Sequence, residues 1–350
     1  MQQKAISEDR SSVRPQDHAL FVGHDHEASV LLRAMQSKQM PHAWLLTGQK
    51  GIGKATLAYR FARMALIGGS DMDIPLEHPV SRKISQGCHP DLLVIEKKIQ
   101  EKTQKADAEI KVEQVREVSG FLAYTAASSP YRVIIVDSAD DLNPNAANAL
   151  LKSLEEPPPQ TVFLLINHRS EAILPTIASR CVRLRMHPLS PEQTQTVLAY
   201  ILPDVTPEGR AALARYANGS PGMAVVLQEG KWEIWLKDSI LLLQQWPKLP
   251  MQMVHLFIDR VLAAKSDEVF KLVLYLLYML LSRVVSSGLG IPVNAMVQDD
   301  ALLQHPRLKA KAMALMPVVQ HIGRMLTDSK VIHAEKRTVL ISLFEQLQKI

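Results

Sequence analysis

Short apolar runs alternate with segments of helical period over the first half of the chain. Runs such as VIIV and FLLI are apolar on both faces, as the central strands of a parallel sheet are. Helical segments separate the runs, so the pattern predicts an α/β layer structure with a parallel five-stranded sheet and flanking helices. The predicted strands are residues 43–48, 91–97, 131–137, 161–167 and 181–186.

The pattern changes after the last of these strands. Strand-like alternation disappears, and apolar residues recur at helical spacing to the end of the chain, which becomes rich in Leu and Met. The first residues are polar and predict a flexible tail. The predicted segments are a tail over 1–18, an α/β domain over 19–187, a small helical domain over 188–233 and a second helical domain over 234–350.

Composition narrows the class of protein. Apolar residues make up 47% of the chain, which is enough to fill hydrophobic cores. Two cysteines, Cys88 and Cys181, cannot build a disulfide framework or a four-thiolate zinc site, which fits a reducing cytoplasm. The N-terminus has no apolar core and predicts no signal peptide. The longest apolar run, 272–281, is about half the length that spans a bilayer and predicts a buried helix, or in part an interface.

Glycines and a lysine at phosphate-loop spacing follow the first predicted strand. They are Gly48, Gly51, Gly53 and Lys54, and a helical pattern comes directly after them, as the motif requires. Glycines let backbone amides turn toward phosphate oxygens, while the helix start and the lysine add positive charge. These four residues are predicted to bind nucleotide. The alternative is a Gly-rich turn that precedes a lysine by chance.

Positions 55 and 138 lack side chains that a magnesium–nucleotide site ordinarily has. Ala55 stands where a Ser or Thr hydroxyl ordinarily ligates Mg²⁺, so the loop could bind phosphates but would position magnesium poorly. Asp137 ends an apolar strand and is the metal-side carboxylate of such folds, or else a strand-end carboxylate that caps a turn. Ser138 follows it, where a water-polarising Glu is common. Asn167, at the end of its own strand, is assigned to the same degenerate nucleotide site, and no metal site is predicted.

Two charged segments come later. Residues 145–159 predict a helix that a proline run ends, and Glu155 with Glu156 could be an acid–base pair, although a solvated helix end is favoured. Arg180 stands between Ser and Cys just before the last strand. A lone surface arginine is usually only solvated, but this one is placed to reach outward. It could stabilise the charge on a transferring phosphoryl group, including one in a neighbouring subunit.

Three segments together resemble the bacterial clamp-loader subunits of the AAA+ class. They are VGHDHEASVLLRAMQSKQMPHAWLLTGQKGIGKATLA, IIVDSADDLNPNAANALLKSLEEPPP and LPTIASRC, in this order and spacing. The helix ANALLKSLEEPP followed by SRC is the most distinctive part, and the resemblance covers roughly residues 20–230. It implies an AAA+ α/β domain, a helical lid domain and a helical collar domain through which subunits oligomerise.

The family contains motor subunits of the gamma/tau type and a non-motor partner, and this chain departs from the motor pattern at three positions. Ala55 and Ser138 are two of them, and Gly222 stands where the motors' lid helix offers an arginine to the phosphates. Together the losses remove metal positioning, water activation and phosphate sensing. The resemblance therefore implies a subunit of the DNA polymerase III holoenzyme with little ATPase activity of its own, which donates Arg180 as an arginine finger in trans.

Partners and cofactors follow from the same resemblance. It implies assembly with the gamma/tau and delta subunits in the cytoplasm, and contact with the sliding clamp and primed DNA through the assembly. The net charge of +5 permits a polyanionic partner without requiring one. No cofactor is required, and weak ATP or ADP binding is left open. The alternatives are an active gamma/tau-type motor ATPase and a small-molecule phosphotransferase, although the helical half offers no second substrate pocket with a base.

Metal binding is not expected. Many family members carry a four-cysteine zinc module between the phosphate-loop helix and the second strand. Here that region, about residues 66–90, holds Cys88 as its one cysteine, so no zinc is predicted. His24 and His26 could be a metal pair but have no third ligand nearby, and we expect them to be solvated.

Overall fold

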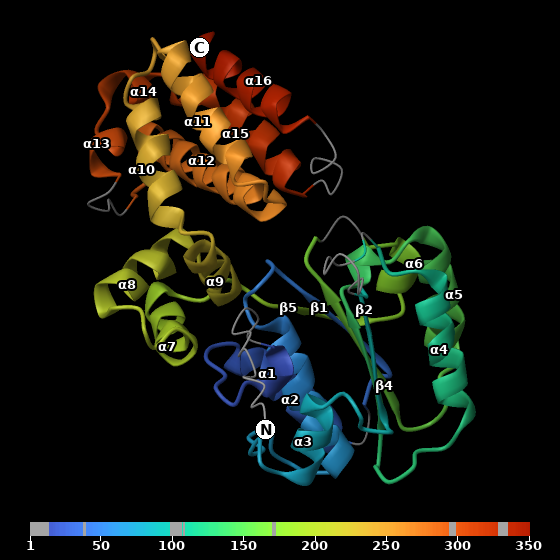
Figure 1. The fold of residues 1–350 in the computed structure, drawn as a ribbon. Coiled ribbons are helices and arrows are strands. Elements are labelled where there is room, and N and C mark those ends of the chain that lie inside the picture. The colour runs from blue at the N-terminus through green and yellow to red at the C-terminus, as the bar shows by residue number, and fades with distance from the viewer. Residues whose placement is uncertain are drawn as a thin grey trace, which may run out of the picture. The chain divides into compact units, whose positions relative to one another are not determined.

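Five parallel strands form one sheet in the order β2-β3-β4-β1-β5 (Figure 1). The computed structural model describes residues 14–37, 40–98, 107, 109–169, 173–293, 299–327 and 335–350. Each predicted strand is present to within one residue at either end, and the predicted fold class is confirmed. The strands are β1 (Ala43–Thr47), β2 (Leu92–Glu96), β3 (Arg132–Asp137), β4 (Thr161–Asn167) and β5 (Val182–Arg185).

Both faces of the sheet are covered by helices, which explains the apolar runs. Alternate residues of a strand point to opposite faces. Leu46 and Ile135 pack with one layer of helices, whereas Leu45 and Ile134 pack with the other. The first layer is α1 (Asp25–Gln36), α2 (Lys54–Ile67) and α3 (Pro79–Ser85), and the second is α4 (Val112–Ala123), α5 (Pro144–Glu155) and α6 (Pro175–Ala178) (Figure 1).

The residues just before the first layer are not a free tail. Residues 14–18 include a short 3₁₀ helix, η1 (Pro15–Asp17), which packs against α2 and α3. Arg63 of α2 is buried, and its guanidinium donates to the carbonyls of Gln16 and His18. A buried guanidinium needs acceptors, and this segment supplies them. The flexible-tail prediction is therefore wrong for 14–18, while the remainder of that tail lies outside the described residues.

The chain divides into two units, Met1–Met223 and Ala224–Ile350. The division falls inside α9 (Pro221–Glu229), ahead of the boundary predicted at 233/234, because the first residues of α9 are hydrogen-bonded to the phosphate loop. The predicted division into four segments otherwise stays a prediction. The first unit also contains η2 (Ala139–Asp141), α7 (Pro191–Ile201) and α8 (Pro207–Tyr216).

The second unit is helical throughout its described residues. Its helices are α10 (Trp232–Leu243), α11 (Met251–Ala263), α12 (Asp267–Gly288), α13 (Asp300–Leu303), α14 (Pro306–Ala310), α15 (Ala312–Thr327) and α16 (Lys336–Gln348). Helix α12 is long and apolar enough to cross a membrane, yet 61% of its apolar window is buried within the protein. It packs against α10, α11, α14 and α15, so the buried helix predicted over 272–281 is confirmed.

Candidate functional site

The carboxyl ends of the parallel strands bring most of the predicted nucleotide-site residues together. In open α/β sheets this edge is where ligands bind. Strand β1 leads into the phosphate loop, residues 48–53, while Asp137 ends β3 and Asn167 ends β4. The amide of Gly48 donates to the carbonyl of Asn167 at 3.3 Å. The structure thus places the loop, Asp137 and Asn167 side by side, as the sequence predicts; their role with nucleotide stays a prediction.

Lys54, the loop lysine, is turned toward its own loop. Its side chain is buried, and Nζ donates to the carbonyls of Gly48 at 2.7 Å and Gln49 at 2.5 Å. An ammonium has three donors, so two of them are used within the loop. Burial lowers the pKa of Lys54 to about 8, against the opposing attraction of Asp137 and Asp140. The cation is consequently held by protein oxygens where phosphate oxygens would be expected.

The other carbonyls of the loop are also engaged. Ser220 Oγ donates to the carbonyl of residue 50 at 2.8 Å, and the amide of Gly222 donates to that of residue 51 at 3.0 Å. His24 Nε2 lies 2.9 Å from the carbonyl of residue 52, a contact that requires the proton on Nε2. Five consecutive carbonyls, 48–52, therefore accept a hydrogen bond from within the first unit.

His24 and Ser220 were not expected in this site. The structure corrects the prediction of a solvated histidine, because His24 caps the loop from the segment before α1. Ser220 caps the start of α9, since its Oγ accepts from the amide of Met223 at 3.1 Å. Its second bond, to the loop, had no signal in the sequence.

Gly222 is in direct backbone contact with the loop. A Cβ added at Gly222 would lie 2.8 Å from Gly51 Cα, and one added at Gly51 would lie 2.5 Å from Ser220 Oγ. Real Cβ atoms do not approach other heavy atoms so closely. Position 222 therefore excludes an arginine for a steric reason as well as lacking one, because any side chain there would push α9 off the loop.

Asp137 is a half-buried carboxylate beside a neutral histidine. Burial, followed by the negative charge of Glu96, raises the pKa of Asp137 to about 6. His168 Nε2 lies 3.9 Å from Asp137 Oδ1, while burial and then the charge of Lys54 lower the pKa of His168 to about 4. At neutral pH His168 is therefore uncharged, and its contact with Asp137 is not an ion pair.

The carboxylates after Asp137 are occupied by other partners. Ser138 Oγ donates to Asp141 Oδ2 at 2.8 Å, and Lys97 Nζ lies 2.9 Å from the same oxygen. Asp140 accepts from Arg169 Nε at 3.1 Å. Ser138 has no proton-accepting carboxylate of its own, and its two acidic neighbours are used in structural contacts. The arrangement does not replace the missing water-polarising glutamate.

Asn167 is fully buried at the end of β4. Its Nδ2 donates to the carbonyl of Arg169 at 3.0 Å, whereas its Oδ1 has no hydrogen-bond partner among the described residues. An unpaired buried acceptor costs about 1–3 kcal/mol. Such a group is typical of a functional position or of a place for an ordered water.

Arg180 lies at the other end of the sheet. It follows α6 and precedes β5, and hence sits near the amino ends of the strands, away from the loop. Its Nη1 donates to the carbonyl of Thr176 at 2.8 Å, and its Nη2 lies 2.6 Å from Glu155 Oε1. Glu155 is exposed at the end of α5, as the favoured interpretation of a solvated helix end predicts, and its carboxylate also pairs with Arg180. The side chain of Arg180 remains 35% exposed.

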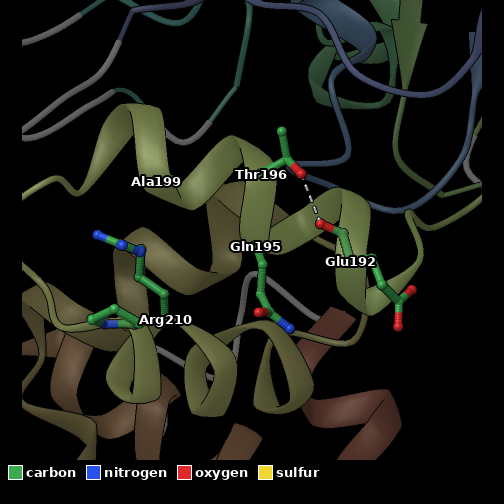
Figure 2. Close-up of a pocket in the computed structure, with 6 residues that line it drawn as sticks. Glu192, Gln195, Thr196, Ala199 and Arg210 are labelled. Carbon is green, nitrogen blue, oxygen red and sulfur yellow. Dashed lines mark hydrogen bonds between the residues drawn. The ribbon is translucent and has the colours of Figure 1, made fainter.

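A shallow hollow between α7 and α8 is separate from both the phosphate loop and Arg180. Its volume is about 320 Å³, and Figure 2 shows Gln195 and Arg210 extending into the space between the two helices. None of the predicted site residues lines it. Arg210 is itself engaged, since Nη1 donates to the carbonyl of Val205 at 2.7 Å. The lining residues are Glu192, Gln195, Thr196, Ala199, Pro207 and Arg210.

Metal-binding side chains are not clustered in the part of the chain that the structure describes. No group of three His, Cys, Asp or Glu residues there is arranged to hold an ion. Cys88 is exposed, and the neighbouring His89 Nδ1 accepts from the amide of Asp91 at 3.2 Å. That no zinc is bound stays a prediction.

Comparison with known proteins connects these features to bacterial replication. Residues 23–190 match the family model for DNA polymerase III, delta subunit. The chain is 39% identical over 189 residues to DNA polymerase III subunit delta' of Pseudomonas aeruginosa, covering 52% of this chain and 54% of that protein. It is 30% identical over 221 residues to DNA polymerase III subunit gamma of Buchnera aphidicola, covering 62% and 58%. The chain thus spans little more than half the length of the curated relatives it matches.

Among solved structures, the chain is similar to a DNA polymerase III gamma subunit-related protein of Thermotoga maritima. The TM-score is 0.48 at 17% sequence identity, and the alignment covers 92% of this chain and 99% of that one.

Proposed function

Because residues 23–190 match the family model for DNA polymerase III, delta subunit, we propose that the chain is a delta prime-type, non-motor subunit of a bacterial clamp loader. In this role it helps to load the sliding clamp onto primed DNA during replication. It hydrolyses little or no ATP itself and donates Arg180 to the nucleotide site of an adjacent motor subunit.

One observation carries the proposal: the residues at the phosphate loop and after β3 lack a metal-ligating hydroxyl and a water-orienting carboxylate. The Lys54 ammonium and the carbonyls of residues 48–52 have partners within the first unit. Phosphoryl transfer needs a metal ligand and a group that orients water. Ala55 has no hydroxyl, and the hydroxyl of Ser138 is bonded to Asp141. The residues present therefore do not fit a hydrolytic Mg²⁺–nucleotide site. The loop keeps the backbone shape of such a site without the groups that hydrolysis needs.

Arg180, unlike Lys54, keeps part of its charged group accessible, which supports a role in trans. A guanidinium is permanently charged and presents its donors in a planar fork that suits phosphate oxygens. Arg180 keeps part of this fork accessible, at a corner of the sheet remote from its own phosphate loop. A group placed in this way can serve a nucleotide bound by another subunit but not one bound by its own chain.

Partners follow from the family. We expect gamma/tau motor subunits and the delta subunit as partners in the cytoplasm, with the sliding clamp and primed DNA engaged through the assembly. The second unit, an independent helical body, is the proposed collar through which subunits join.

The test is reconstitution of the loader with the Arg180→Ala variant. Arginine fingers contribute about 10³–10⁵-fold to phosphoryl transfer, so turnover at the nucleotide site that Arg180 serves should fall by at least about tenfold, and the DNA-stimulated kcat of the loader should fall by the share that this site supplies. Arg183→Ala is the matched control, because Arg183 is an exposed arginine of the adjoining strand. An unchanged kcat with Arg180→Ala would contradict the proposal.

A motor ATPase of the gamma/tau type is the second candidate, favoured by the similarity to gamma subunits. It predicts that the purified chain alone hydrolyses ATP at about 1 per second or faster. It also predicts tight nucleotide binding that depends on Mg²⁺, which calorimetry with and without the metal would detect. Ala55, which has no hydroxyl, and Ser138, which has no carboxylate, predict neither result.

A further inference from the structure

Glu155 is a carboxylate at an unfavourable position for its own helix. It is the last residue of α5, and carboxylates at a helix C-terminus face the negative end of the helix dipole. Glu156 follows directly, which adds a second negative charge. A positive partner offsets this repulsion, and Arg180 is that partner: its Nη2 lies 2.6 Å from Glu155 Oε1.

Three contacts define the orientation of the Arg180 guanidinium. Nη1 donates to the carbonyl of Thr176 at 2.8 Å and to Ser179 Oγ at 3.4 Å, while Nη2 contacts Glu155. A guanidinium has five N–H donors. These contacts use three of them, so the Nε donor and one Nη2 donor remain for another acceptor. The contacts hold one part of the fork and leave the other part free.

The groups that hold Arg180 are mounted on a rigid frame. Glu155 adjoins Leu154, and Thr176 adjoins Ile177; both Leu154 and Ile177 are buried in the core beneath the sheet. Helices α5 and α6 also pack against each other. A functional side chain is held accurately when its anchors sit on packed elements of this kind.

The ion pair contributes little to stability. The side chains of Arg180 and Glu155 are 35% and 49% exposed, and pairs at such positions have small net effects on folding. Its consequence lies in the geometry of the arginine. We propose that Glu155 is a positioning residue, which orients Arg180 so that its free donors meet the nucleotide of the adjacent subunit. This inference rests on the proposed function of Arg180 as a trans-acting finger.

The experiment compares Glu155→Gln with Glu156→Gln in the reconstituted loader. Gln keeps the shape of Glu but removes the charge that binds the guanidinium. Glu156 is an exposed neighbour that makes no recorded contact with Arg180, so its variant controls for lost charge at the same helix end. Misplacement of a catalytic group can reduce a rate by up to about 10²-fold. We expect Glu155→Gln to lower the DNA-stimulated kcat by about three- to tenfold with KM for ATP unchanged, and Glu156→Gln to leave both unchanged.

A double variant separates positioning from a general structural effect. If Glu155 acts through Arg180, adding Glu155→Gln to Arg180→Ala changes the rate no further, because the group being positioned is already gone. Incorporation of each variant into the loader, measured by gel filtration, is expected to stay normal. An additional loss in the double variant, or failed incorporation of Glu155→Gln, would overturn the proposal.

The remaining outcomes separate the role of Arg180 from the role of Glu155. If Arg180→Ala lowers kcat but Glu155→Gln does not, Arg180 acts as a finger and Glu155 does not position it. If Glu155→Gln raises kcat, the ion pair restrains the arginine and the proposal is again wrong. If Arg180→Ala itself has no effect, the proposed function fails, and the role of Glu155 fails with it.

Discussion

The phosphate loop and the Arg180 corner belong to one domain but handle their polar groups in opposite ways. In the loop, five successive carbonyls and a buried lysine are bonded within the first unit. At the corner, an arginine has three contacts and still offers donors outward. The loop lacks two groups for phosphoryl transfer, since Ala55 has no hydroxyl and Ser138 has no carboxylate. The contrast teaches that the two ends of one sheet can treat their polar groups differently, with internal bonds at one end and an accessible guanidinium at the other.

The Gly51→Ala substitution tests the contact between the phosphate loop and the start of α9. Its φ of +80° and the 2.5 Å approach to Ser220 Oγ make both the backbone and the space unsuitable for a side chain. We expect the first unit to lose about 2–4 kcal/mol of unfolding free energy, from strain plus overpacking. Hydrogen exchange of the β1 and β4 amides in increasing urea measures it. Gly53→Ala is the control, because its φ is also positive but no atom lies within 4 Å of the added Cβ. Equal losses would mean that the contact with α9 is unimportant.

Ser220→Ala should have a smaller effect on the same region. It removes a helix cap and the bond to the carbonyl of Lys50, for an expected loss of about 1–2 kcal/mol. Thr206→Ala removes the cap of α8, which has no bond to the loop. Exchange of the amides in 48–53 is expected to accelerate in Ser220→Ala alone. Acceleration in both variants would show that the loop responds to general destabilisation.

The smallest expected effect is on pH dependence, because two groups beside the loop oppose each other. Asp137 has a pKa raised from 3.8 to about 6, so the folded state binds more protons and stability falls as pH rises through this range. His168 has a pKa lowered from 6.5 to about 4, so the unfolded state binds more protons. Its contribution to the unfolding free energy therefore rises with pH over nearly the same range.

Removing one group exposes the other. The quantity to compare is the unfolding free energy at pH 6 minus that at pH 4.5. Relative to the unmodified chain, we expect this difference to be about 1 kcal/mol more positive in Asp137→Asn and about 1 kcal/mol less positive in His168→Gln. Urea titrations at the two pH values measure both differences. Changes of the same sign in the two variants would contradict this account.

Local patterns in the sequence predicted the elements of the first unit well. Apolar runs predicted all five strands, and the proline run 157–159 predicted where α5 ends. The shared carboxyl edge of parallel strands then brought the loop, Asp137 and Asn167 together. These predictions depend on interactions between near neighbours or on general rules of topology.

Contacts between distant residues were not predictable in the same way. Ser220 is 170 residues from Lys50, and Arg63 is 47 residues from Gln16. Each pair joins a common side chain to a backbone carbonyl, which leaves no mark in the composition of either segment. The pairing of Glu155 with Arg180 was missed for the same reason, since a charge at a helix end is ordinarily solvated. The sequence therefore identified the loop, Asp137, Asn167 and Arg180, but not the contacts that His24, Ser220 and Glu155 make with them.

The hydrogen bond between Gly222 and Gly51 has an evolutionary consequence. Restoring an arginine at 222 would force α9 away from the loop before the new charge could meet a phosphate. An arginine could therefore not be gained at position 222 by a single substitution without displacing the start of α9. This contact between two glycines restricts which side chains can occur at position 222.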